Sequence, residues 1–147
     1  MSSAFVQCQG YLADTGTAKG LGVFASRDVA QDEVVELSPV IRIESDLQQV
    51  HQALRTRVFD WHRLAGQPGV FAVALGYGSL YNHANPANLR YSADLDGGAL
   101  RFVAARAIRS GEELTINYND AGGDVVSSDD NWFRCNQVDC VGPPDAP

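Results

Sequence analysis

The sequence predicts a single, mostly β domain that contains one amphipathic helix. Its 147 residues suit one domain, because a chain of this length already buries a full hydrophobic core. Apolar residues make up 45% of the chain and charged residues 20%, which is typical of a folded globular protein and argues against disorder. Short β-branched runs bounded by turn residues recur along the chain, whereas only one segment repeats apolar residues at helical spacing.

The expected strands follow from these short runs and from the turn signals between them. A glycine-bearing turn at residues 19–25 precedes the first run. Asp96-Gly97-Gly98 separates two later runs and predicts a hairpin, because glycine adopts the positive φ that tight turns need. The apolar run at 70–75 is too short to be assigned as strand or helix. The last strand alternates apolar and polar residues, so we expect one of its faces to be buried. The expected strands are residues 33–37, 40–43, 90–95, 99–104 and 114–118.

One segment has the spacing of an amphipathic helix. It begins at a suitable cap, Ser45 or Asp46, and ends near Gly66. Its apolar residues recur at steps of three and four, which would place them on one face of a helix, packed on the core. This stripe consists of Leu47, Val50, Leu54, Val58 and Trp61.

The charge balance favours a basic protein partner over nucleic acid. Lys and Arg number 11 and Asp and Glu 18, which gives a net charge of −7. An acidic surface repels phosphate, so direct nucleic-acid binding is not expected, whereas a lysine-rich peptide would be attracted. No stretch is apolar enough to span a membrane, and the first residues lack the pattern of a secretory leader. The odd number of cysteines, 3, favours the reducing cytoplasm, with a secreted effector as the alternative.

Three short segments contain residue types that carry chemistry: Gly20-Leu21-Gly22, residues 81–88 and residues 111–118. Each has an ordinary structural explanation. Gly-x-Gly is usually a turn, a lone histidine such as His83 is usually structural, and Tyr118 suits a strand. The 3 histidines share no ligand spacing, so zinc bound through histidine is not expected. The order in which the segments occur is more informative than any one of them.

In that order the segments resemble the SET-domain family of protein lysine methyltransferases. Residues 20–25 match the family's early Gly-x-Gly-hydrophobic-aromatic-Ala motif, and residues 82–88 resemble its Asn-His-Ser-Cys-x-Pro-Asn motif. Residues 111–118 match Gly-Glu-Glu-Leu-Thr-x-x-Tyr at each fixed position. The chain looks closest to the small stand-alone SET proteins of bacteria and large viruses. The resemblance implies a β-clip SET domain at 1–134, with one inserted helix and a knot-like C-terminal crossing, and a flexible tail at 135–147.

The resemblance also implies roles for individual residues. Tyr118 would be the catalytic tyrosine, and Asn88 would hold the crossing. The expected S-adenosylmethionine site consists of Lys19, Gly20, Leu21, Gly22, Asn82, His83 and Trp132. The channel for the substrate lysine would be lined by Tyr77, Tyr91 and Tyr118. The inserted region borders the peptide groove in the family, so its exposed arginines, Arg55, Arg57 and Arg63, would touch substrate.

The chain departs from the family pattern at Ala84 and Asn85, which replace the motif's Ser and Cys. In many relatives that Cys joins a later Cys-x-Cys-x4-Cys segment to bind zinc. Here Cys135 and Cys140 keep the four-residue gap, but Phe133 stands where their partner would be. The four thiolates of a structural zinc site are therefore incomplete, and no metal is expected.

The resemblance implies methyl transfer from S-adenosylmethionine to lysine ε-amines of a protein, with the accessible lysine in a histone-like or other basic segment. Attack requires the neutral amine, and an apolar aromatic channel beside a sulfonium favours loss of the lysine proton. A rival interpretation is a non-enzymatic SET-like module that binds a peptide without turnover, and a third is an unrelated β-rich domain. The sequence specifies neither the oligomeric state nor the target lysine.

Overall fold

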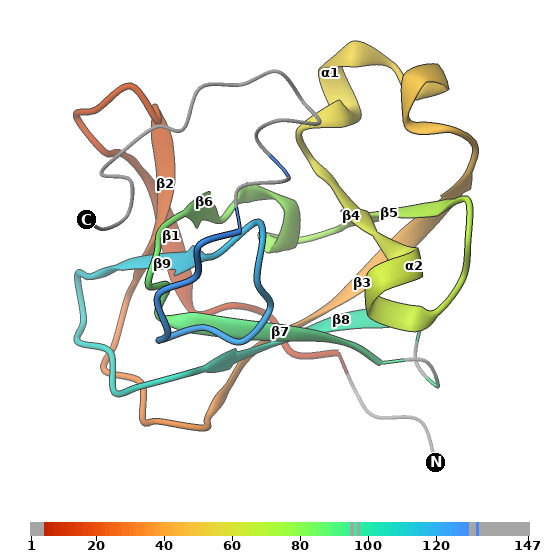
Figure 1. Cartoon of the computed structure of the whole chain (residues 1–147). Coiled ribbons are helices and arrows are strands. Elements are labelled where there is room, and N and C mark those ends of the chain that lie inside the picture. Colours follow the sequence, from red (N-terminus) through yellow and green to blue (C-terminus); the bar gives the residue numbers. More distant parts are fainter. Residues whose placement is uncertain (1–4, 95, 97, 130–131, 133–147) are drawn as a thin grey trace.

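The structure is a computed structural model that describes residues 5–94, 96, 98–129 and 132. Two sheets and a few short helices make up this part of the chain (Figure 1). The strands are β1 (Gly10–Asp14), β2 (Leu21–Ala25), β3 (Val34–Glu44), β4 (Val58–Asp60), β5 (Val70–Ala74), β6 (Asn82–His83), β7 (Leu89–Asp94), β8 (Ala99–Ala104) and β9 (Glu113–Ile116). The helices are η1 (Leu47–Gln49), α1 (Gln52–Arg55), α2 (Trp61–Ala65) and η2 (Gly78–Leu80). The expected mostly β fold is confirmed.

The first sheet has the order β1-β2-β9-β6. β1 and β2 form an antiparallel hairpin. Of the turn expected at residues 19–25, only the first two residues belong to a turn, because Leu21–Ala25 is the strand β2. β6 is only two residues long and runs parallel to β9, with Asn82 opposite Thr115 and His83 opposite Ile116. Leu114, Thr115 and Ile116 are all buried, so β9 has two covered faces rather than the single one expected.

The second sheet has the order β4-β5-β3-β8-β7. The expected hairpin between residues 90–95 and 99–104 is confirmed as β7 and β8, and the run at 70–75 forms β5. The two strands expected at 33–37 and 40–43 are one continuous strand, β3. Pro39 is the last residue that pairs with β8, and Val40 is the first that pairs with β5. The N–H that proline lacks is therefore missing at the point where β3 changes partner, so β3 can continue through it.

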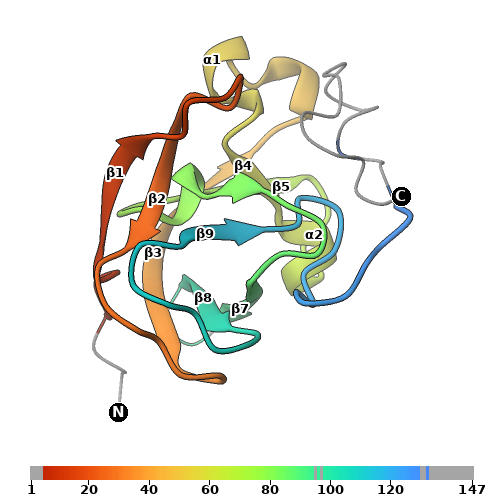
Figure 2. The same ribbon diagram turned by 90° about the vertical axis from the view of Figure 1, so that its left-hand side faces the viewer.

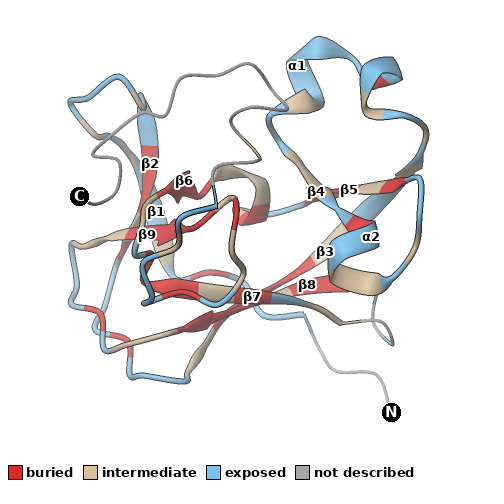
Figure 3. Cartoon of the chain, in the orientation of Figure 1, coloured by how far each residue is buried: buried red, intermediate tan, exposed pale blue. Residues whose placement is uncertain are grey.

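The single helix expected from Ser45 or Asp46 to near Gly66 is wrong, because this segment folds as η1, α1, β4 and α2. Val58 pairs with Val73 of β5, and Asp60 ends the strand by capping α2: its carboxylate accepts from the N–H groups of His62 and Arg63. Edge pairing and capping thus stabilise two short elements in place of a continuous helix. The apolar stripe is divided accordingly. Trp61 is buried, whereas Leu54 on the exposed helix α1 is 41% exposed (Figure 3).

The segment that follows β9 crosses over the segment that follows β6. Figure 2 shows β6 and β9 side by side, with the two segments running together beyond them. The Asp124 N–H donates to the Ala87 carbonyl at 2.6 Å. The Asn85 amide donates to the Ser127 carbonyl at 2.6 Å and accepts from the Ser127 N–H at 2.9 Å. Asn85, which replaces the motif's cysteine, therefore fastens the crossing through hydrogen bonds.

Gly123 lies at the tightest point of this crossing. It is buried and has φ of +67°, and a Cβ there would stand 2.6 Å from the Leu89 carbonyl oxygen. We expect Gly123→Ala to lower the free energy of unfolding by about 1–3 kcal/mol, because the added methyl forces the two segments apart. Gly98→Ala is the matched control, since Gly98 has φ of +58° but open space around its Cα. Equal losses in the two variants, measured by urea denaturation, would contradict the steric role.

Glu36 is a carboxylate buried in the core of the second sheet, with 3% of its surface exposed. Its oxygens accept a hydrogen bond from the Tyr81 hydroxyl at 2.6 Å and one from the Tyr77 N–H at 3.0 Å. Burial raises the pKa of Glu36, and the hydrogen bonds from Tyr81 and Tyr77 oppose that rise only in part.

The raised pKa of Glu36 predicts a specific pH dependence. The unfolded side chain titrates near pH 4.3, so between about pH 4.3 and the higher folded pKa the folded state binds more protons than the unfolded state. The contribution of Glu36 to stability therefore falls as pH rises through that window and is constant above it. In Glu36→Gln this fall should disappear, while Glu44→Gln, an exposed change on the same strand, should keep it. Urea denaturation from pH 4 to 8 measures the difference; parallel curves for wild type and Glu36→Gln would contradict it.

Candidate active site

A cavity of about 370 Å³ lies between the inserted segment and the residues that follow β9. Its walls come from η1 to β5, from residues 78–81 and from the end of β9 onwards. Aromatic side chains form much of the lining: Phe59, Phe71, Tyr81, Tyr91, Tyr118 and Trp132. Such a lining excludes water and attracts cations through the faces of the rings. The cavity therefore suits a long side chain that ends in an amine.

Tyr118 joins this cavity to the β6 strand. Its hydroxyl donates to the Tyr81 carbonyl at 2.8 Å, and its backbone N–H donates to His83 Nδ1 at 3.1 Å. Because Nδ1 accepts, a neutral His83 carries its proton on Nε2. Burial raises the pKa of Tyr118 to about 12, so the hydroxyl is protonated at neutral pH. Tyr118 can orient and polarise a bound group through hydrogen bonding but cannot act as a phenolate base there.

Asn82 brings the first and third sequence segments together. Its amide nitrogen donates to the Leu21 carbonyl at 2.9 Å and to Glu113 Oε2 at 2.8 Å. Gly22 lies beside the same carboxylate, and a Cβ at this position would stand 2.5 Å from Glu113 Oε2. The missing side chain at Gly22 therefore leaves room for the Glu113 carboxylate in this position, and the Asn82 side chain is held by two partners.

Lys19 places a positive charge beside β6. Its ammonium donates to the His83 carbonyl at 2.6 Å, and no carboxylate of the described residues lies within 4.0 Å of it. Lys19 is half-buried and lies within the turn that Gly20, with φ of +74°, closes. This arrangement leaves a cation available for an anionic group at the edge of the Asn82-His83 strand.

Asn88 links the crossing to β9 through both ends of its amide. Its nitrogen donates to the Glu113 carbonyl at 2.8 Å, and its oxygen accepts from the Thr115 N–H at 2.9 Å. Asn88 is buried, so these bonds are protected from water. The side chain replaces ladder bonds that the two-residue strand β6 is too short to make.

The other two tyrosines expected in the lysine channel lie in different places. Tyr91 lines the cavity, donates from its hydroxyl to the Asn117 carbonyl at 2.9 Å and packs edge-on against Phe59 with ring centroids 5.5 Å apart. Burial raises its pKa. Tyr77 does not line this cavity; it packs against the core and donates its N–H to Glu36. Trp132 lines the cavity, and its ring contacts that of Tyr118 with centroids 4.6 Å apart.

Sequence reasoning missed Tyr81 and Glu113 as site residues. Tyr81 contributes a backbone carbonyl to Tyr118, and a carbonyl carries no side-chain signal in a sequence. The sequence signal that could have identified Tyr81 is its position directly before Asn82-His83. Glu113 contributes the carboxylate that holds Asn82, and it stands within the third sequence segment. Both residues position side chains that the sequence did identify.

No metal cluster gathers in the described part of the chain: within it, no three His, Cys, Asp or Glu side chains are placed to hold an ion. Cys8 is a buried free thiol. Phe133, Cys135, Cys140 and the expected tail at 135–147 lie outside the described residues. None of the helices described here is long and apolar enough to span a membrane.

Comparison with known proteins identifies the family of this chain. The model of the SET domain family matches residues 20–119, which include all three sequence segments. A curated relative, the H3 lysine-37-specific histone-lysine N-methyltransferase of Schizosaccharomyces pombe, is 29% identical over 102 residues. The match covers 69% of this chain and 68% of that protein. The resemblance to bacterial and viral members stays a prediction, since these matches are eukaryotic.

Solved structures show the same fold at lower identity. A proposed histone methyltransferase of Plasmodium falciparum matches with a TM-score of 0.61 and 22% identity, over 77% of this chain and 95% of that one. A humanized mutant of the Chaetomium thermophilum Polycomb Repressive Complex 2 matches with a TM-score of 0.65 and 23% identity, over 88% of this chain. A related structure of that complex, bound to S-adenosylmethionine, matches with a TM-score of 0.64 and 21% identity, over 79% of this chain.

This chain spans only 16% of the length of the chain it matches in each of the two Polycomb structures, so the likeness there concerns one domain of a larger protein. The matched segment contains Asn82, His83, Asn88 and Tyr118, the residues that the structure gathers around β6 and β9. The chain belongs to the SET domain family and is a homologue of a histone-lysine N-methyltransferase.

Proposed function

We propose that this protein transfers methyl groups from S-adenosylmethionine to lysine ε-amines of a protein substrate. The observation that carries the proposal is the position of Tyr118. Its hydroxyl, bonded to the Tyr81 carbonyl, lines the aromatic cavity, while its backbone is bonded to His83 of β6. A donor bound beside β6 and an amine entering the cavity would meet at this hydroxyl.

The residues beside β6 fit the chemistry of the donor. When bound, S-adenosylmethionine supplies an electrophilic methyl carbon on a sulfonium, and it carries a carboxylate at one end. Lys19, which has no carboxylate partner among the described residues, would bind that carboxylate. Asn82 and His83 would contact the cofactor along β6, and Trp132, whose ring contacts Tyr118, would cover it.

The cavity would prepare the substrate amine. A lysine in water has a pKa near 10.4, so it is almost fully protonated at pH 7 and has no free lone pair. Transfer to the aromatic cavity desolvates the ammonium and favours loss of its proton to solvent. The nitrogen lone pair then forms the new bond to the methyl carbon, and the electron pair of the broken carbon–sulfur bond stays on sulfur.

Tyr118 would hold the amine in line for this displacement. Its hydroxyl stays protonated because burial raises its pKa to about 12, and its proton is directed to the Tyr81 carbonyl. The hydroxyl oxygen then keeps its lone pairs as acceptors, which would stabilise the partial positive charge on the transferring methyl group. Positioning is the main contribution, because in-line geometry alone can supply several kcal/mol of the barrier.

Replacing Tyr118 should separate chemistry from binding. In Tyr118→Phe we expect the turnover number for methyl transfer to a lysine peptide to fall about 100-fold, since the hydroxyl that aligns the amine is lost. The affinity for S-adenosylmethionine, measured by calorimetry, should stay within a factor of about 3, a change of less than 1 kcal/mol. Tyr11→Phe, an exposed change on β1, is the control. Full turnover in Tyr118→Phe would show that the tyrosine has no catalytic role.

Replacing Lys19 should show which part of the cofactor it binds. Lys19→Met should weaken S-adenosylmethionine binding by about 10-fold or more, because hydrogen bonds to charged groups contribute about 1.5–3 kcal/mol. Binding of the decarboxylated analogue should be nearly unaffected, and Lys19→Arg should restore part of the affinity. Calorimetry with both ligands tests this. An equal loss for the two ligands would mean that Lys19 only supports the fold of β6.

A protein that binds lysine peptides but not S-adenosylmethionine would instead be a binding module with the SET fold. Calorimetry on the wild-type protein separates this alternative from the enzyme before any variant is made.

A further inference from the structure

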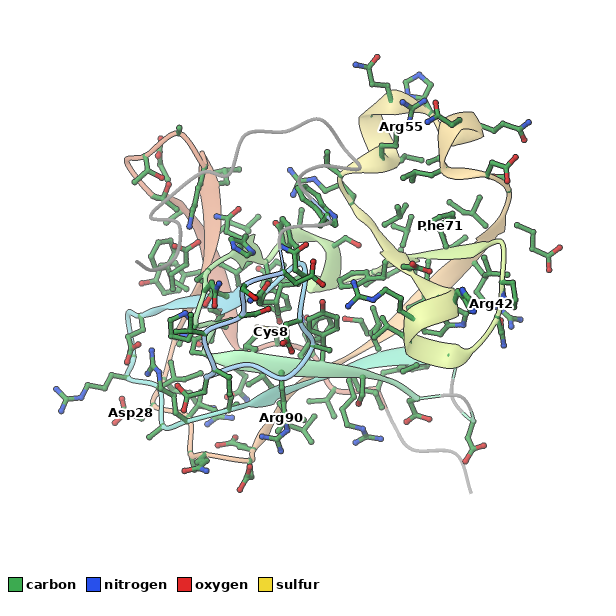
Figure 4. The ribbon with its side chains drawn as sticks, in the orientation of Figure 1. Cys8, Asp28, Arg42, Arg55, Phe71 and Arg90 are labelled. Atoms are coloured by element: carbon green, nitrogen blue, oxygen red, sulfur yellow. The ribbon has the colours of Figure 1, made fainter. Side chains whose placement is uncertain are left out.

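Three arginines of the inserted region line the cavity: Arg55 of α1, Arg57 before β4 and Arg63 of α2. Arg57 and Arg63 are exposed and Arg55 is half-buried. Figure 4 shows Arg55 at α1, and Phe71, another lining residue, between α1 and α2. The lining of the aromatic cavity therefore includes three arginines, although the chain as a whole is acidic.

Each of these guanidinium groups is held by backbone carbonyls, and none has a carboxylate partner within 4.0 Å among the described residues. Arg55 donates to the carbonyls of Val50 at 3.1 Å and Gln48 at 2.8 Å. Arg63 donates to the Asn119 carbonyl at 3.0 Å, and Arg57 makes one long bond of 3.4 Å to the Ser79 carbonyl. A carbonyl fixes the direction of a guanidinium but leaves its charge unbalanced, and each group keeps further N–H donors.

Arginines elsewhere in the described chain mostly have carboxylate partners within 4.0 Å. These ion pairs are Arg27–Glu33, Arg90–Asp32, Arg101–Asp94 and Arg106–Glu112. At the cavity the described lining contains one carboxylate, Asp60, which accepts from the N–H groups of His62 and Arg63 as the cap of α2. The described cavity border therefore carries more positive than negative charge.

The positive charge of Arg57 and Arg63 acts on tyrosines that line the cavity. Burial raises the pKa of Tyr118, and the charge of Arg57 acts against that rise. Burial likewise raises the pKa of Tyr91, and Arg63 acts against it. Tyr91 and Tyr118, two of the three tyrosines that line the cavity, are thus within the electrostatic reach of Arg63 and Arg57.

We propose that the substrate segment carries Asp or Glu close to its target lysine, and that Arg55, Arg57 and Arg63 recognise these acidic side chains. This inference rests on the proposed function and names its substrate class. Guanidinium binds carboxylate through two parallel N–H donors, so each arginine offers a directional site for an acidic side chain. A segment rich in Lys and Arg would meet like charge at the same place and be disfavoured.

Acidic flanks also fit the chemistry of the amine. An ammonium entering between guanidinium groups is destabilised by like charge, which favours the neutral amine that must react. Acidic side chains outside the cavity would offset this repulsion at the encounter and leave the ε-amine desolvated in the aromatic part.

The test compares three peptides that share one central lysine and differ only in flanking Glu, Gln or Arg. Binding is measured by fluorescence anisotropy and methyl incorporation by mass spectrometry, with S-adenosylmethionine present. The Glu-flanked peptide should bind about 3- to 10-fold more tightly than the Gln-flanked one, since exposed ion pairs each contribute modestly. The preference should shrink at high salt. Equal binding of all three peptides, or tighter binding of the Arg-flanked one, would overturn the inference.

Charge reversal assigns the preference to these arginines. Arg57→Glu/Arg63→Glu should abolish or invert the preference for the Glu-flanked peptide. Arg57→Glu alone should reduce the preference and keeps the test valid if the double variant fails to fold, because among the described residues the Arg57 side chain makes only the long bond to the Ser79 carbonyl. Arg42→Glu is the matched control, because Arg42 is exposed and does not line the cavity (Figure 4). An unchanged preference in Arg57→Glu, or an equal loss in Arg42→Glu, would overturn the assignment.

These measurements distinguish the proposed methyltransferase activity from the proposed recognition of acidic flanks. Methylation with a preference for Arg flanks would overturn the inference and leave the methyltransferase intact. Preferential binding of the Glu-flanked peptide without S-adenosylmethionine binding or methylation would refute the methyltransferase and support recognition of acidic segments by this cavity.

Discussion

The parallel pairing of β6 with β9 is the constraint on which the site depends. Two residues of parallel ladder are too few to be stable alone, and parallel pairs require a long connection between the strands. Asn88 supplies the missing bonds through its side chain, and the crossing segment covers the pair from outside. This pairing sets Asn82 and His83 against the residues that lead into Tyr118, so β6 and Tyr118 are positioned by the same few hydrogen bonds.

Much of the site consists of backbone groups held by the fold. The Tyr81 carbonyl accepts from Tyr118, and the His83 carbonyl accepts from Lys19. The orientation of Tyr81 depends in turn on Glu36, a buried carboxylate whose pKa burial raises. A carboxylate in the core is unfavourable unless its hydrogen bonds are made, so Tyr81 and Glu36 stabilise each other and fix the backbone on which Tyr118 rests. The hydrogen bonds of the core and those of the site therefore form one network.

Local patterns predicted the elements that depend on local chemistry. The hairpin of β7 and β8 follows from its glycine turn, and Asn82, His83 and Tyr118 of two of the sequence motifs lie beside one another, with Lys19 bonded to the His83 carbonyl. Elements that depend on partners distant in sequence were not predictable. Pro39 looks like a break until β3 is seen to change partner there, and Val58 fits a helical stripe until it pairs with β5. Tyr77 shares its residue type with Tyr91 but packs against the core outside the cavity, and its backbone N–H donates to Glu36; only the backbone path decides between the two places.

The charge of the whole chain and the charge at the cavity act over different distances. At physiological ionic strength the Debye length is about 8 Å, so acidic residues spread over the surface are screened from a ligand seated in the cavity. Three guanidinium groups at the cavity border are not screened in this way, because they would touch the ligand directly. The net charge of −7 therefore governs encounters at long range and low salt, while under the proposed recognition the arginines would govern which segment stays bound. The composition alone favours a basic partner, whereas the cavity would select an acidic segment. Both expectations hold if the target lysine lies in an acidic stretch of an otherwise basic protein.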